Sequence, residues 1–378
     1  MRVGFKVKIY PNETQKQILS QHIGACRYVY NHFLALKKET YLTTGKSLTH
    51  SIMSRELTKM RREIDWMSKV QFQPMQQSLR SLDVAYNRFF RKQADFPNFH
   101  KKNGKQTMRK VMGWSIEGNK INIMNGVSVR FRGTFPEKRY GTLTITRDSC
   151  GDWWASTFGE KAMEKPKLSG AIGIDVGLKH IAITSDGEKY DNPHVFRGLL
   201  GHIQTASKAL SRTQKGSRTR AKRLLTLSRV HRRVGAMRKN HLHHVSKAIV
   251  GKNHAMIAVE DLNVKGMMQN RKLSRAIADT GWGELIRQLE YKQERKGGKL
   301  LRIDRFFPSS KMCSECNFVL DTLSLSVREW KCPSCGITHD RDINAAKTIL
   351  KQAGEQLGLE GGENNSRKRV KVTRPVKV

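Results

Sequence analysis

The stretch AIGIDVGLKHIAITSDG, residues 171–187, reads as an apolar strand that ends at Asp175, a glycine-containing turn and a second apolar strand. Short apolar runs bounded by glycine are typical of strands buried in a sheet. A carboxylate that ends a core strand is costly unless it is paired, binds a metal or faces solvent. Asp175 is therefore a candidate functional residue, and Gly173 and Gly177 beside it allow close approach of backbone or ligand.

Two further acidic residues occupy comparable places. Glu260 ends the apolar run MIAVE, and Asp342 opens a helix in HDRDINAA, where Asp340 is a candidate N-cap. Taken singly, such residues are more often structural, as we expect for Asp261 on the surface and Asp186 in a turn. Carboxylates that converge from two strand ends and a helix start suit Mg²⁺. Two such ions about 4 Å apart can activate a water and stabilise the leaving oxygen of a phosphodiester without a separate side-chain base.

Four of the six cysteines follow the pattern C-x2-C-x15-C-x2-C. They are Cys313, Cys316, Cys332 and Cys335. Each C-x2-C turn presents two thiolates, and two such turns complete a tetrahedron around Zn²⁺. Four protein ligands leave no open position, so this zinc is expected to be structural rather than catalytic. Cys26 and Cys150 fall outside the pattern and are expected to be small, buried apolar side chains.

The chain is strongly basic. Its 378 residues include 71 Lys and Arg against 32 Asp and Glu, which gives a formal net charge of +39. Such an excess destabilises the compact state unless a polyanion neutralises it, which favours nucleic acid or an anionic membrane surface as the partner. The sequence has no apolar run of about 18 residues, and the opening MRVGFKVKIY lacks the apolar segment of a signal peptide. We therefore expect a cytoplasmic protein that binds nucleic acid.

Residues 192–259 contain fifteen Lys or Arg and seven His but no Asp or Glu. Apolar residues spaced by three or four, from Leu224 to Met237, predict a helix with one apolar face and a cationic remainder. A charge run is usually a solvated surface, but the lack of any compensating acid favours contacts with phosphates. The candidate phosphate-binding residues are Arg212, Arg218, Arg220, Lys222, Arg223, Arg229, Arg232 and Arg233.

Three histidines of the same basic stretch are an alternative set of metal ligands: His241, His243 and His244. Their flanks are rich in Lys and Arg, and this positive charge opposes the binding of a cation. Phosphate contact or a solvated surface is therefore the favoured interpretation of these histidines.

The amino-terminal part predicts a strand followed by helices. GFKVKIY, residues 4–10, alternates apolar and basic residues and reads as a strand. A helix is predicted over 12–38, with Asn12 or Thr14 as its cap. Two more helices are predicted around 51–64 and 74–93, and together the three form a helical subdomain.

Between about residues 107 and 158, apolar residues recur at every second position. This alternation predicts a small antiparallel β module. A linker begins at EKPKLSG, so the main boundary is placed near Lys165. Beyond the cysteine-rich insert, a helix is predicted from 342 to 350. The tail SRKRVKVTRPVKV has six basic residues and no acidic one, and it is expected to be disordered.

The order of GIDVG, VEDL, SSKMCSECN, WKCPSCG and HDRDINAA resembles the TnpB proteins of IS200/IS605-type bacterial transposons, which are compact relatives of type V CRISPR effectors. The opening KVKIYPNETQKQIL and the segment CRYVYNHFL look like the amino-terminal region of that family. The resemblance therefore spans nearly the whole chain.

The resemblance implies an α/β multidomain fold. Residues 1–165 would form a β-barrel wedge domain that carries a helical recognition insertion at about 12–105. Residues 166–352 would form a RuvC nuclease domain of ribonuclease H-like fold, with a zinc ribbon inserted at 308–338. Residues 353–378 would form the basic tail.

The resemblance also implies an activity, namely RNA-guided cleavage of double-stranded DNA beside a short transposon-adjacent motif. The guide RNA would come from the transposon end, with one protein copy per RNA, and the protein would associate with the nucleoid through DNA. Carried over by motif, Asp175, Glu260 and Asp342 would be the catalytic ligands of a two-ion Mg²⁺ site, and the four cysteines would bind zinc. The wedge and helical regions, near residues 86–100, would read the adjacent motif.

The high positive charge fits this activity, because a cationic channel holds the backbone of a guide RNA–DNA heteroduplex while base pairing supplies most of the specificity. Two alternatives stay open. One is an RNA-guided DNA-binding repressor without cleavage, which the intact acidic triad disfavours. The other is an unguided transposition accessory factor.

Overall fold

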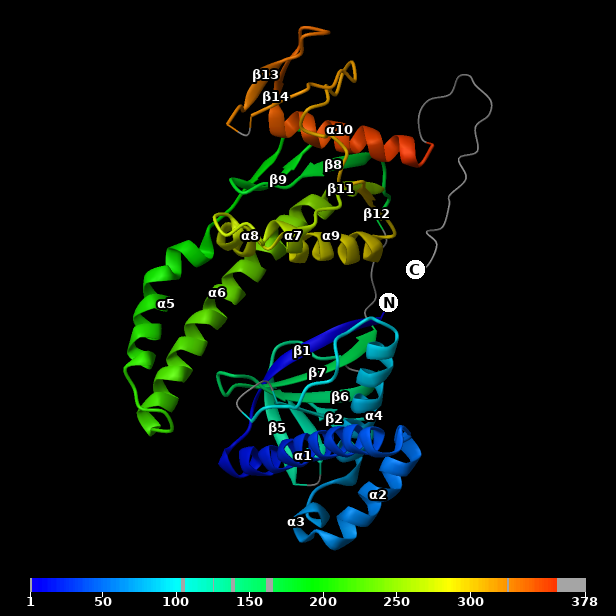
Figure 1. Cartoon of the computed structure of the whole chain (residues 1–378), viewed down its shortest axis with the longest axis vertical. Coiled ribbons are helices and arrows are strands. Elements are labelled where there is room, and N and C mark those ends of the chain that lie inside the picture. Colours follow the sequence, from blue (N-terminus) through cyan, green and yellow to red (C-terminus); the bar gives the residue numbers. More distant parts are fainter. Residues whose placement is uncertain are drawn as a thin grey trace. The chain divides into compact units, whose positions relative to one another are not determined.

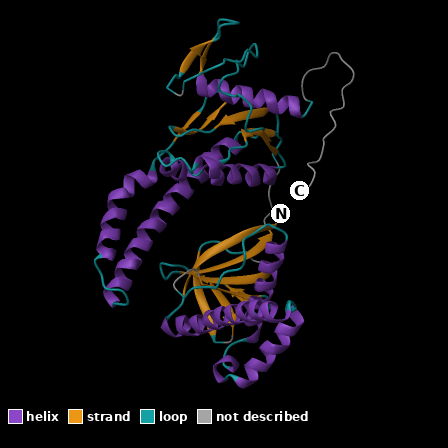
Figure 2. Cartoon of the chain, viewed as in Figure 1, coloured by secondary structure: helices purple, strands orange, loops and turns teal. Residues whose placement is uncertain are grey.

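The computed structural model describes residues 2–102, 106–124, 126–136, 140–160, 166–324 and 326–358. The chain divides into two compact units, one made of residues 1–163 with 205–230 and the other of residues 164–204 with 231–378. Both units mix helices and strands, as the predicted α/β class requires (Figures 1 and 2). The predicted boundary near Lys165 and residues 359–378 of the predicted tail lie outside the described residues. None of the described helices is long and apolar enough to cross a bilayer.

A seven-stranded antiparallel sheet forms the centre of the first unit. Its strands are β1 (Arg2–Tyr10), β2 (Gln106–Lys110), β3 (Ser115–Glu117), β4 (Lys120–Met124), β5 (Val127–Arg132), β6 (Tyr140–Arg147) and β7 (Trp153–Glu160). They pair in the order β2-β6-β7-β1-β5-β4-β3. The edge strands β2 and β3 do not pair with each other within the described residues, so closure into the predicted barrel stays a prediction.

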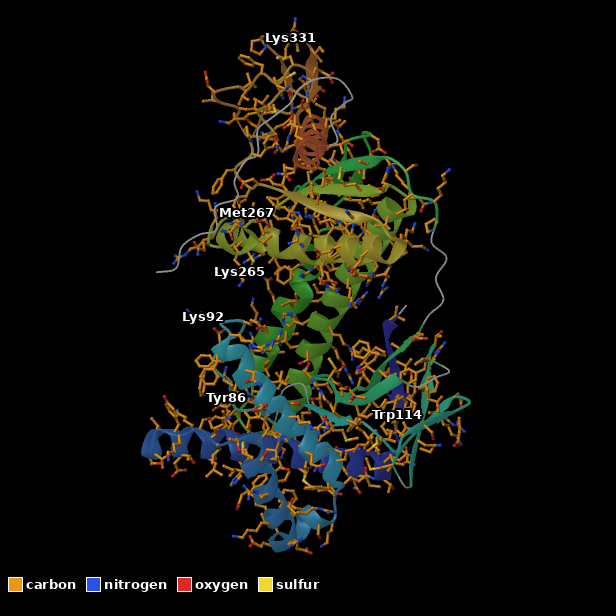
Figure 3. All side chains as sticks on the ribbon, turned by 90° about the vertical axis from the view of Figure 1, so that its right-hand side faces the viewer. Tyr86, Lys92, Trp114, Lys265, Met267 and Lys331 are labelled. Carbon is orange, nitrogen blue, oxygen red and sulfur yellow. The ribbon has the colours of Figure 1, made fainter. Side chains whose placement is uncertain are left out.

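Buried and exposed side chains alternate along these strands, and the buried ones form the core of the first unit. In β7 every second residue from Trp153 to Gly159 is buried, as expected for a strand with one face in a core. Ile9 of β1 and Ile121 of β4 lie in the same cluster as Trp114. Trp114, which Figure 3 labels, is 1% exposed, and its indole N–H donates to the carbonyl of Gly141 at 3.3 Å. The buried indole is thereby satisfied.

Four helices are inserted between β1 and β2, within the predicted range of about 12–105. They are α1 (Glu13–Thr44), α2 (His50–Glu63), α3 (Asp65–Ser68) and α4 (Phe72–Phe90). The Asn12 side chain accepts a bond from the Gln15 backbone at 2.9 Å, and the Gln15 side chain accepts one from the Asn12 backbone at 3.0 Å. This reciprocal cap fixes the start of α1 and confirms Asn12 as the capping residue. The helix ends at Gly45, whose φ of 68° favours glycine.

The second unit contains a mixed five-stranded sheet. Its strands are β8 (Ala171–Asp175), β9 (His180–Thr184), β10 (Lys189–Asp191), β11 (Met256–Glu260) and β12 (Lys299–Ile303). They pair in the order β10-β9-β8-β11-β12. β11 runs parallel to both β8 and β12, whereas β9 is antiparallel to β8 and to β10.

Helices follow or connect these strands. They are α5 (Val195–Ser211), α6 (Arg218–Gly251), α7 (Val264–Met267), α8 (Ser274–Thr280), α9 (Trp282–Lys296) and α10 (Arg341–Gln356). The short strands β13 (Glu329–Lys331) and β14 (Thr338–Asp340) form a hairpin just before α10. Figure 3 labels Lys331 on this hairpin and both Lys265 and Met267 on α7.

Both faces of the second sheet are covered, which explains the continuous apolar runs of its parallel strands. Ile257 and Val259 of β11 pack in one cluster with residues of α6 and α9. Met256 and Ala258 of the same strand pack in another cluster with Ile349 of α10. Figure 1 shows α10 on one face of this sheet and α9 on the other.

The close approach of α10 to β8 depends on Gly173. A Cβ atom at this position would collide with the carbonyl oxygen of Ala346 and would lie only 2.9 Å from Cβ of Leu350. Gly173 and Asp175 share a face of β8, and Asp342 lies one helical turn before Ala346. The contact at Gly173 therefore also sets where Asp342 stands relative to Asp175.

The predicted end of the last helix is wrong. α10 continues to Gln356, beyond the predicted end at 350 and beyond residue 353, where the tail was placed. Ala353 is fully buried in the cluster that α10 shares with β11 and β12. Burial of this helix face offsets the low helix propensity of Gly354, which reads as a stop signal in the sequence.

Replacement of Gly173 by Ala is expected to lower the stability of the protein by about 1–3 kcal/mol, because α10 must move away from β8 to accept the added methyl group. Thermal unfolding measures the change. Gly198→Ala is the control, since Gly198 is an exposed helical residue with no atom within 4 Å of the added Cβ. A destabilisation that is equal in the two variants would contradict the close-packing argument.

Candidate active site and zinc centre

Two of the three candidate carboxylates lie side by side at one edge of the second sheet. Asp175 is the last residue of β8 and Glu260 the last residue of β11. These strands are parallel neighbours, with Ile174 opposite Val259. The carboxyl ends of the two strands therefore meet, as the apolar runs AIGID and MIAVE predicted.

The third carboxylate comes from the start of α10. Asp340 caps this helix, since its Oδ1 atom accepts the backbone N–H groups of Asp342 at 3.0 Å and Ile343 at 3.1 Å. Its other carboxylate oxygen lies 2.6 Å from Nζ of Lys189. The predicted capping role of Asp340 is confirmed. The cap fixes the backbone of Asp342 in the first helical turn.

The charges of the two other carboxylates act on Asp175. Burial raises the pKa of Asp175 to about 7, and the negative charges of Asp342 and Glu260 add to this rise. Burial also raises the pKa of Glu260, while a hydrogen bond with the Ser309 side chain opposes that rise. Three acids held near one another in partial burial repel, and a divalent cation would relieve this repulsion. Carboxylate oxygens are the ligands that Mg²⁺ prefers, so the donor set fits that ion.

The carboxylate oxygens do not form a tight cluster. In the described part of the chain, the only group of three or more metal-ligating side chains with all ligand atoms within 4.8 Å of one another is the cysteine group. The guanidinium of Arg328 lies 3.6 Å from the Asp342 carboxylate and is largely exposed. Asp261 pairs with Arg305 at 2.7 Å, and Asp186 lies in the predicted turn, 2.6 Å from Lys252.

The four predicted zinc ligands do come together. The Sγ atoms of Cys313 and Cys335 are 3.7 Å apart, and those of Cys316 and Cys332 are 3.5 Å apart. A tetrahedron with zinc–sulfur bonds of about 2.3 Å has sulfur–sulfur edges of about 3.8 Å. The four thiols therefore fit a zinc ion without rearrangement.

A buried histidine supports this centre. Nε2 of His339 lies 3.0 Å from Sγ of Cys313, and the His339 ring packs against Trp330 at 4.9 Å between centroids. Burial is the main cause that lowers the pKa of His339, which favours the neutral imidazole. A neutral imidazole can donate an N–H bond to a metal-bound thiolate and so orient it.

The zinc centre is joined to the helix that carries Asp342. The side-chain amide of Asn344 accepts the backbone N–H of Ser314 at 2.9 Å and donates to the carbonyl of Met312 at 2.7 Å. The Thr348 hydroxyl donates to the carbonyl of Ser309 at 2.8 Å, and Ser309 also bonds Glu260. The roles of Ser309 and Asn344 were not predicted, although the two residues stand in the motifs SSKMCSECN and HDRDINAA.

The two remaining cysteines are buried, and one of the three histidines contacts the backbone. Cys26 and Cys150 are buried, as predicted, and burial raises the pKa of the Cys26 thiol to about 12. Nε2 of His241 lies 3.0 Å from the backbone oxygen of Asp191. No metal-ligating group among the described residues includes His241, His243 or His244.

The candidate phosphate-binding residues lie on α6, which begins earlier than the predicted apolar spacing from Leu224, and in the turn before it. Arg212 belongs to the turn, and α6 carries Arg218, Arg220, Lys222, Arg223, Arg229, Arg232 and Arg233. All are exposed except Arg220, which is half-buried. Arg220 donates to the carbonyls of Leu210 at 3.1 Å and Thr213 at 3.0 Å, so it closes the turn between α5 and α6. Its structural role was not predicted.

Comparison with known proteins defines the class first. The Cas12f1 chain in a cryo-EM structure of a Cas12f1–sgRNA–target DNA complex matches with a TM-score of 0.58 at 11% identity, over 93% of this chain and 98% of that one. The chain therefore has the multidomain α/β fold of Cas12f1. A Cas12f1-like TNB domain matches residues 282–349, a probable transposase model matches residues 158–271, and a helix-turn-helix domain model matches residues 1–46.

The relatives then define the family. A Streptomyces pristinaespiralis protein named "Putative RNA-guided DNA endonuclease" is 35% identical over 356 residues, which cover 92% of this chain and 88% of the relative. The Escherichia coli K12 protein InsQ, which carries the same description, is 31% identical over 368 residues, or 92% of this chain and 91% of the relative. The chain belongs to the TnpB family, as the motif order predicted.

Purified protein is expected to contain one zinc ion per chain, and Cys332→Ser is expected to lose it. Metal analysis by mass spectrometry measures the content. Since the centre is bonded to α10 through Asn344, loss of zinc should also lower the Tm by roughly 5–10 °C. Cys150→Ala is the control, because Cys150 is buried outside the cluster. Full zinc content in Cys332→Ser would show that the four thiols do not form the site.

In metal-free protein at pH 8, Asp175→Asn is expected to raise the Tm by a few degrees. A carboxyl group with a raised folded-state pKa binds protons more readily in the folded than in the unfolded protein. The charged Asp175 therefore lowers the stability of the folded state fully above about pH 7 and not at all below about pH 4. The difference in Tm between Asp175→Asn and the wild-type protein should therefore decrease as the pH falls and should vanish near pH 4. Thermal scans across this range with a chelator present measure it.

Asp186→Asn is the matched control with the opposite sign. Burial raises the pKa of Asp186, but hydrogen bonds from Lys252 and Thr184 outweigh it and lower the pKa overall. Loss of this carboxylate should destabilise the protein at pH 8. A destabilised Asp175→Asn variant under the same conditions would refute the proposed repulsion among the three carboxylates.

Proposed function

We propose that this protein is an RNA-guided DNA endonuclease encoded by a transposon, which cleaves DNA next to a short transposon-adjacent motif. The convergence of Asp175, Glu260 and Asp342 at one edge of the second sheet carries the proposal. The names of the relatives support the RNA-guided DNA endonuclease activity. Mg²⁺ dependence and recognition of an adjacent motif are parts of the proposal.

The nuclease domain is proposed to be of RuvC type and to run from residue 166 to the end of α10 at Gln356, with the zinc ribbon at 308–338. The strand order β10-β9-β8-β11-β12, in which only β9 runs antiparallel to β8, supports a ribonuclease H-like fold. Residues 1–165 are proposed to form the wedge domain with its recognition insertion.

Each carboxylate has a distinct support. β8 holds Asp175 at its end, β11 holds Glu260, whose carboxylate Ser309 orients, and the Asp340 cap holds Asp342. A bound pair of Mg²⁺ ions would supply an activated water and would stabilise the leaving oxygen of a phosphodiester. The repulsion among the carboxylates keeps the site poised for cations, and the surrounding positive charge attracts the phosphate backbone.

The basic residues of α6 and its preceding turn are proposed to contact phosphates of a guide RNA or of its heteroduplex with DNA. The exposed guanidinium and ammonium groups from Arg212 to Arg233 provide many cations without a neighbouring acid in the sequence. Contacts of this kind position nucleic acid but do not read its sequence. The guide RNA would supply sequence specificity by base pairing, with one protein copy per RNA.

Asp175→Asn, Glu260→Gln and Asp342→Asn are each expected to reduce cleavage of a matched plasmid by at least about a hundredfold, since metal coordination supplies several kcal/mol of transition-state stabilisation. Binding of the copurifying RNA should be unchanged. The assay follows Mg²⁺-dependent linearisation of a plasmid library with randomised flanks. Glu290→Gln, an exposed carboxylate on α9 that pairs with Arg302 at 3.0 Å, is the control.

If the wild-type protein binds DNA with its guide but does not cleave it, the result would favour an RNA-guided DNA-binding repressor over an endonuclease. Absence of any defined copurifying RNA would favour an unguided transposition factor. Full cleavage by Asp175→Asn would show that the Asp175 carboxylate is not needed for the reaction and would contradict the proposed carboxylate site.

A further inference from the structure

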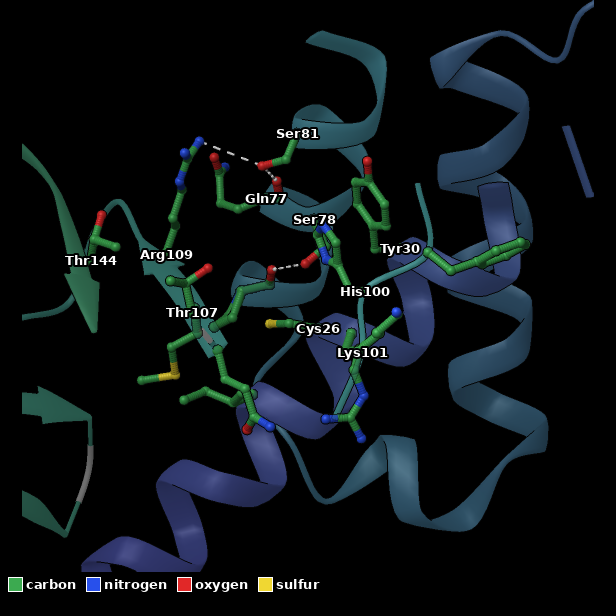
Figure 4. Close-up of a pocket in the computed structure, with 16 residues that line it drawn as sticks. Cys26, Tyr30, Gln77, Ser78, Ser81, His100, Lys101, Thr107, Arg109 and Thr144 are labelled. Carbon is green, nitrogen blue, oxygen red and sulfur yellow. Dashed lines mark hydrogen bonds between the residues drawn. The ribbon is translucent and has the colours of Figure 1, made fainter. Parts of the chain in front are cut away.

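A cavity of about 520 Å³ opens in the first unit, remote in sequence from the three candidate carboxylates and from the four candidate zinc ligands (Figure 4). Its wall combines one face of α1, one face of α4, strand β2 and the segment 99–101 that precedes β2. The volume falls in the range of about 300–1,000 Å³ that is typical of sites for small ligands. The cavity therefore has room for a ligand of nucleotide size.

The charge of the lining favours an anion. Arg27, Lys101 and Arg109 line the cavity, and none of the 16 described lining residues is acidic. None of the three cations forms an ion pair with a described residue, and the guanidinium of Arg109 reaches only the hydroxyl of Ser81, at 3.5 Å. Figure 4 shows Ser81 and Arg109 pointing toward each other from α4 and β2. Three cations without acids at one concave site suit phosphate groups.

An aromatic pair at the same cavity provides a stacking surface. The rings of Tyr30 and His100 are nearly parallel, 8° apart, with centroids separated by 3.8 Å. Asn31 fixes the backbone of His100 by donating to its carbonyl at 3.0 Å and accepting its N–H at 2.8 Å. A rigid aromatic face is the usual platform for an unstacked base, because every base has a π-face.

The polar groups of α4 could contact the edge of a base. Gln77 and Ser78 line the cavity, and the Ser78 hydroxyl donates to the carbonyl of Pro74 at 3.4 Å. The side-chain amide of Gln77 makes no hydrogen bond with the residues that the structure describes. A glutamine amide offers one acceptor and two donors, which matches the mixed donors and acceptors of a base edge.

Exposed aromatic residues lie along the segment that leads to the cavity. The ring of Phe96 packs against Tyr86 at 5.6 Å and against Phe89 at 5.3 Å between centroids. Phe96 itself is 41% exposed and Phe99 is 56% exposed. Successive exposed aromatics suit the successive bases of a single strand. They favour a nucleotide within a strand over a free nucleotide.

A second cavity of the first unit, of about 590 Å³, has a different lining from the first. Its described lining residues, which include Trp114 and Asn122, carry no charge. It therefore lacks the groups that would neutralise a phosphate. Only the first of these two cavities combines cations with stacked aromatic rings.

We propose that the cavity between α1, α4 and β2 binds one unstacked nucleotide of a single-stranded nucleic acid segment. The base stacks on the Tyr30–His100 pair, and Arg27, Lys101 and Arg109 neutralise the flanking phosphates. The inference rests on the proposed function only in requiring that the protein binds RNA or DNA. Both sources share the chemistry of a base and a phosphate.

Photo-crosslinking of the ribonucleoprotein tests the proposal. Asp175→Asn protein with its copurifying RNA, with and without matched target DNA, is irradiated at 254 nm, digested with nucleases and trypsin, and examined by mass spectrometry. We expect a nucleotide adduct on the peptides that contain Tyr30 or Phe99 to Lys101. A ribonucleotide mass identifies RNA as the source, and a deoxyribonucleotide mass identifies DNA. Adducts elsewhere on the protein with none on these peptides would overturn the proposal.

Variants with matched charge give a second measurement. His100→Ala should lower the adduct yield at Tyr30 and weaken binding about 5- to 100-fold, and His100→Phe should restore both because it keeps a stacking ring. The double variant Arg27→Gln with Arg109→Gln should weaken binding more than Arg55→Gln with Arg80→Gln, which removes the same charge from exposed residues outside the cavity. Equal effects of the two double variants would overturn the role of the cavity.

The outcomes separate this inference from the proposed function. If guided cleavage persists while the cavity variants behave like their controls, the cavity assignment fails and the endonuclease stands. If the adduct forms at the cavity and matched DNA is never cleaved, the endonuclease fails and the nucleotide site stands.

Discussion

The backbone contact between α10 and β8 at Gly173 is the constraint on which the second unit depends. The missing side chain lets the carbonyl of Ala346 approach the strand directly, and Ile349 and Ala353 of the helix then pack against β11 and β12. The same approach carries the first turn of α10 toward the carboxyl ends of β8 and β11. The contact at Gly173 thus contributes both to the packing of α10 and to the position of Asp342.

The proposed acidic site and the proposed zinc ribbon are joined by hydrogen bonds through α10. Ser309 links the Glu260 carboxylate to Thr348 of α10, and Asn344 links the first cysteine turn to the same helix. The ribbon lies between β12 and α10 in the sequence, so its closure determines how the chain enters α10. A closed four-thiolate metal centre is well suited to this role because it is rigid and has no open coordination position.

The sequence predicted those parts of the site that depend on local patterns. Apolar runs that end in a carboxylate placed Asp175 and Glu260 correctly, and the cysteine spacing placed all four thiols. The hydrogen bonds by which Ser309, Asn344 and His339 support the carboxylates and the cysteines were not predicted. They depend on how the cysteine-rich segment folds back on α10. Local signals also misjudged the end of α10, where tertiary burial of Ala353 overrides Gly354, and they missed the bonds by which Arg220 closes its turn.

The position of α10 in the chain orders the appearance of the acidic site during synthesis. Asp175 and Glu260 leave the ribosome before the cysteine-rich segment, whereas Asp342 leaves it after that segment. Contacts between residues so distant in sequence form late, since the loop between them must close first. A nascent chain thus exposes the basic residues of α6 before its three acids are assembled, so the cationic surface and the acidic group form at different times.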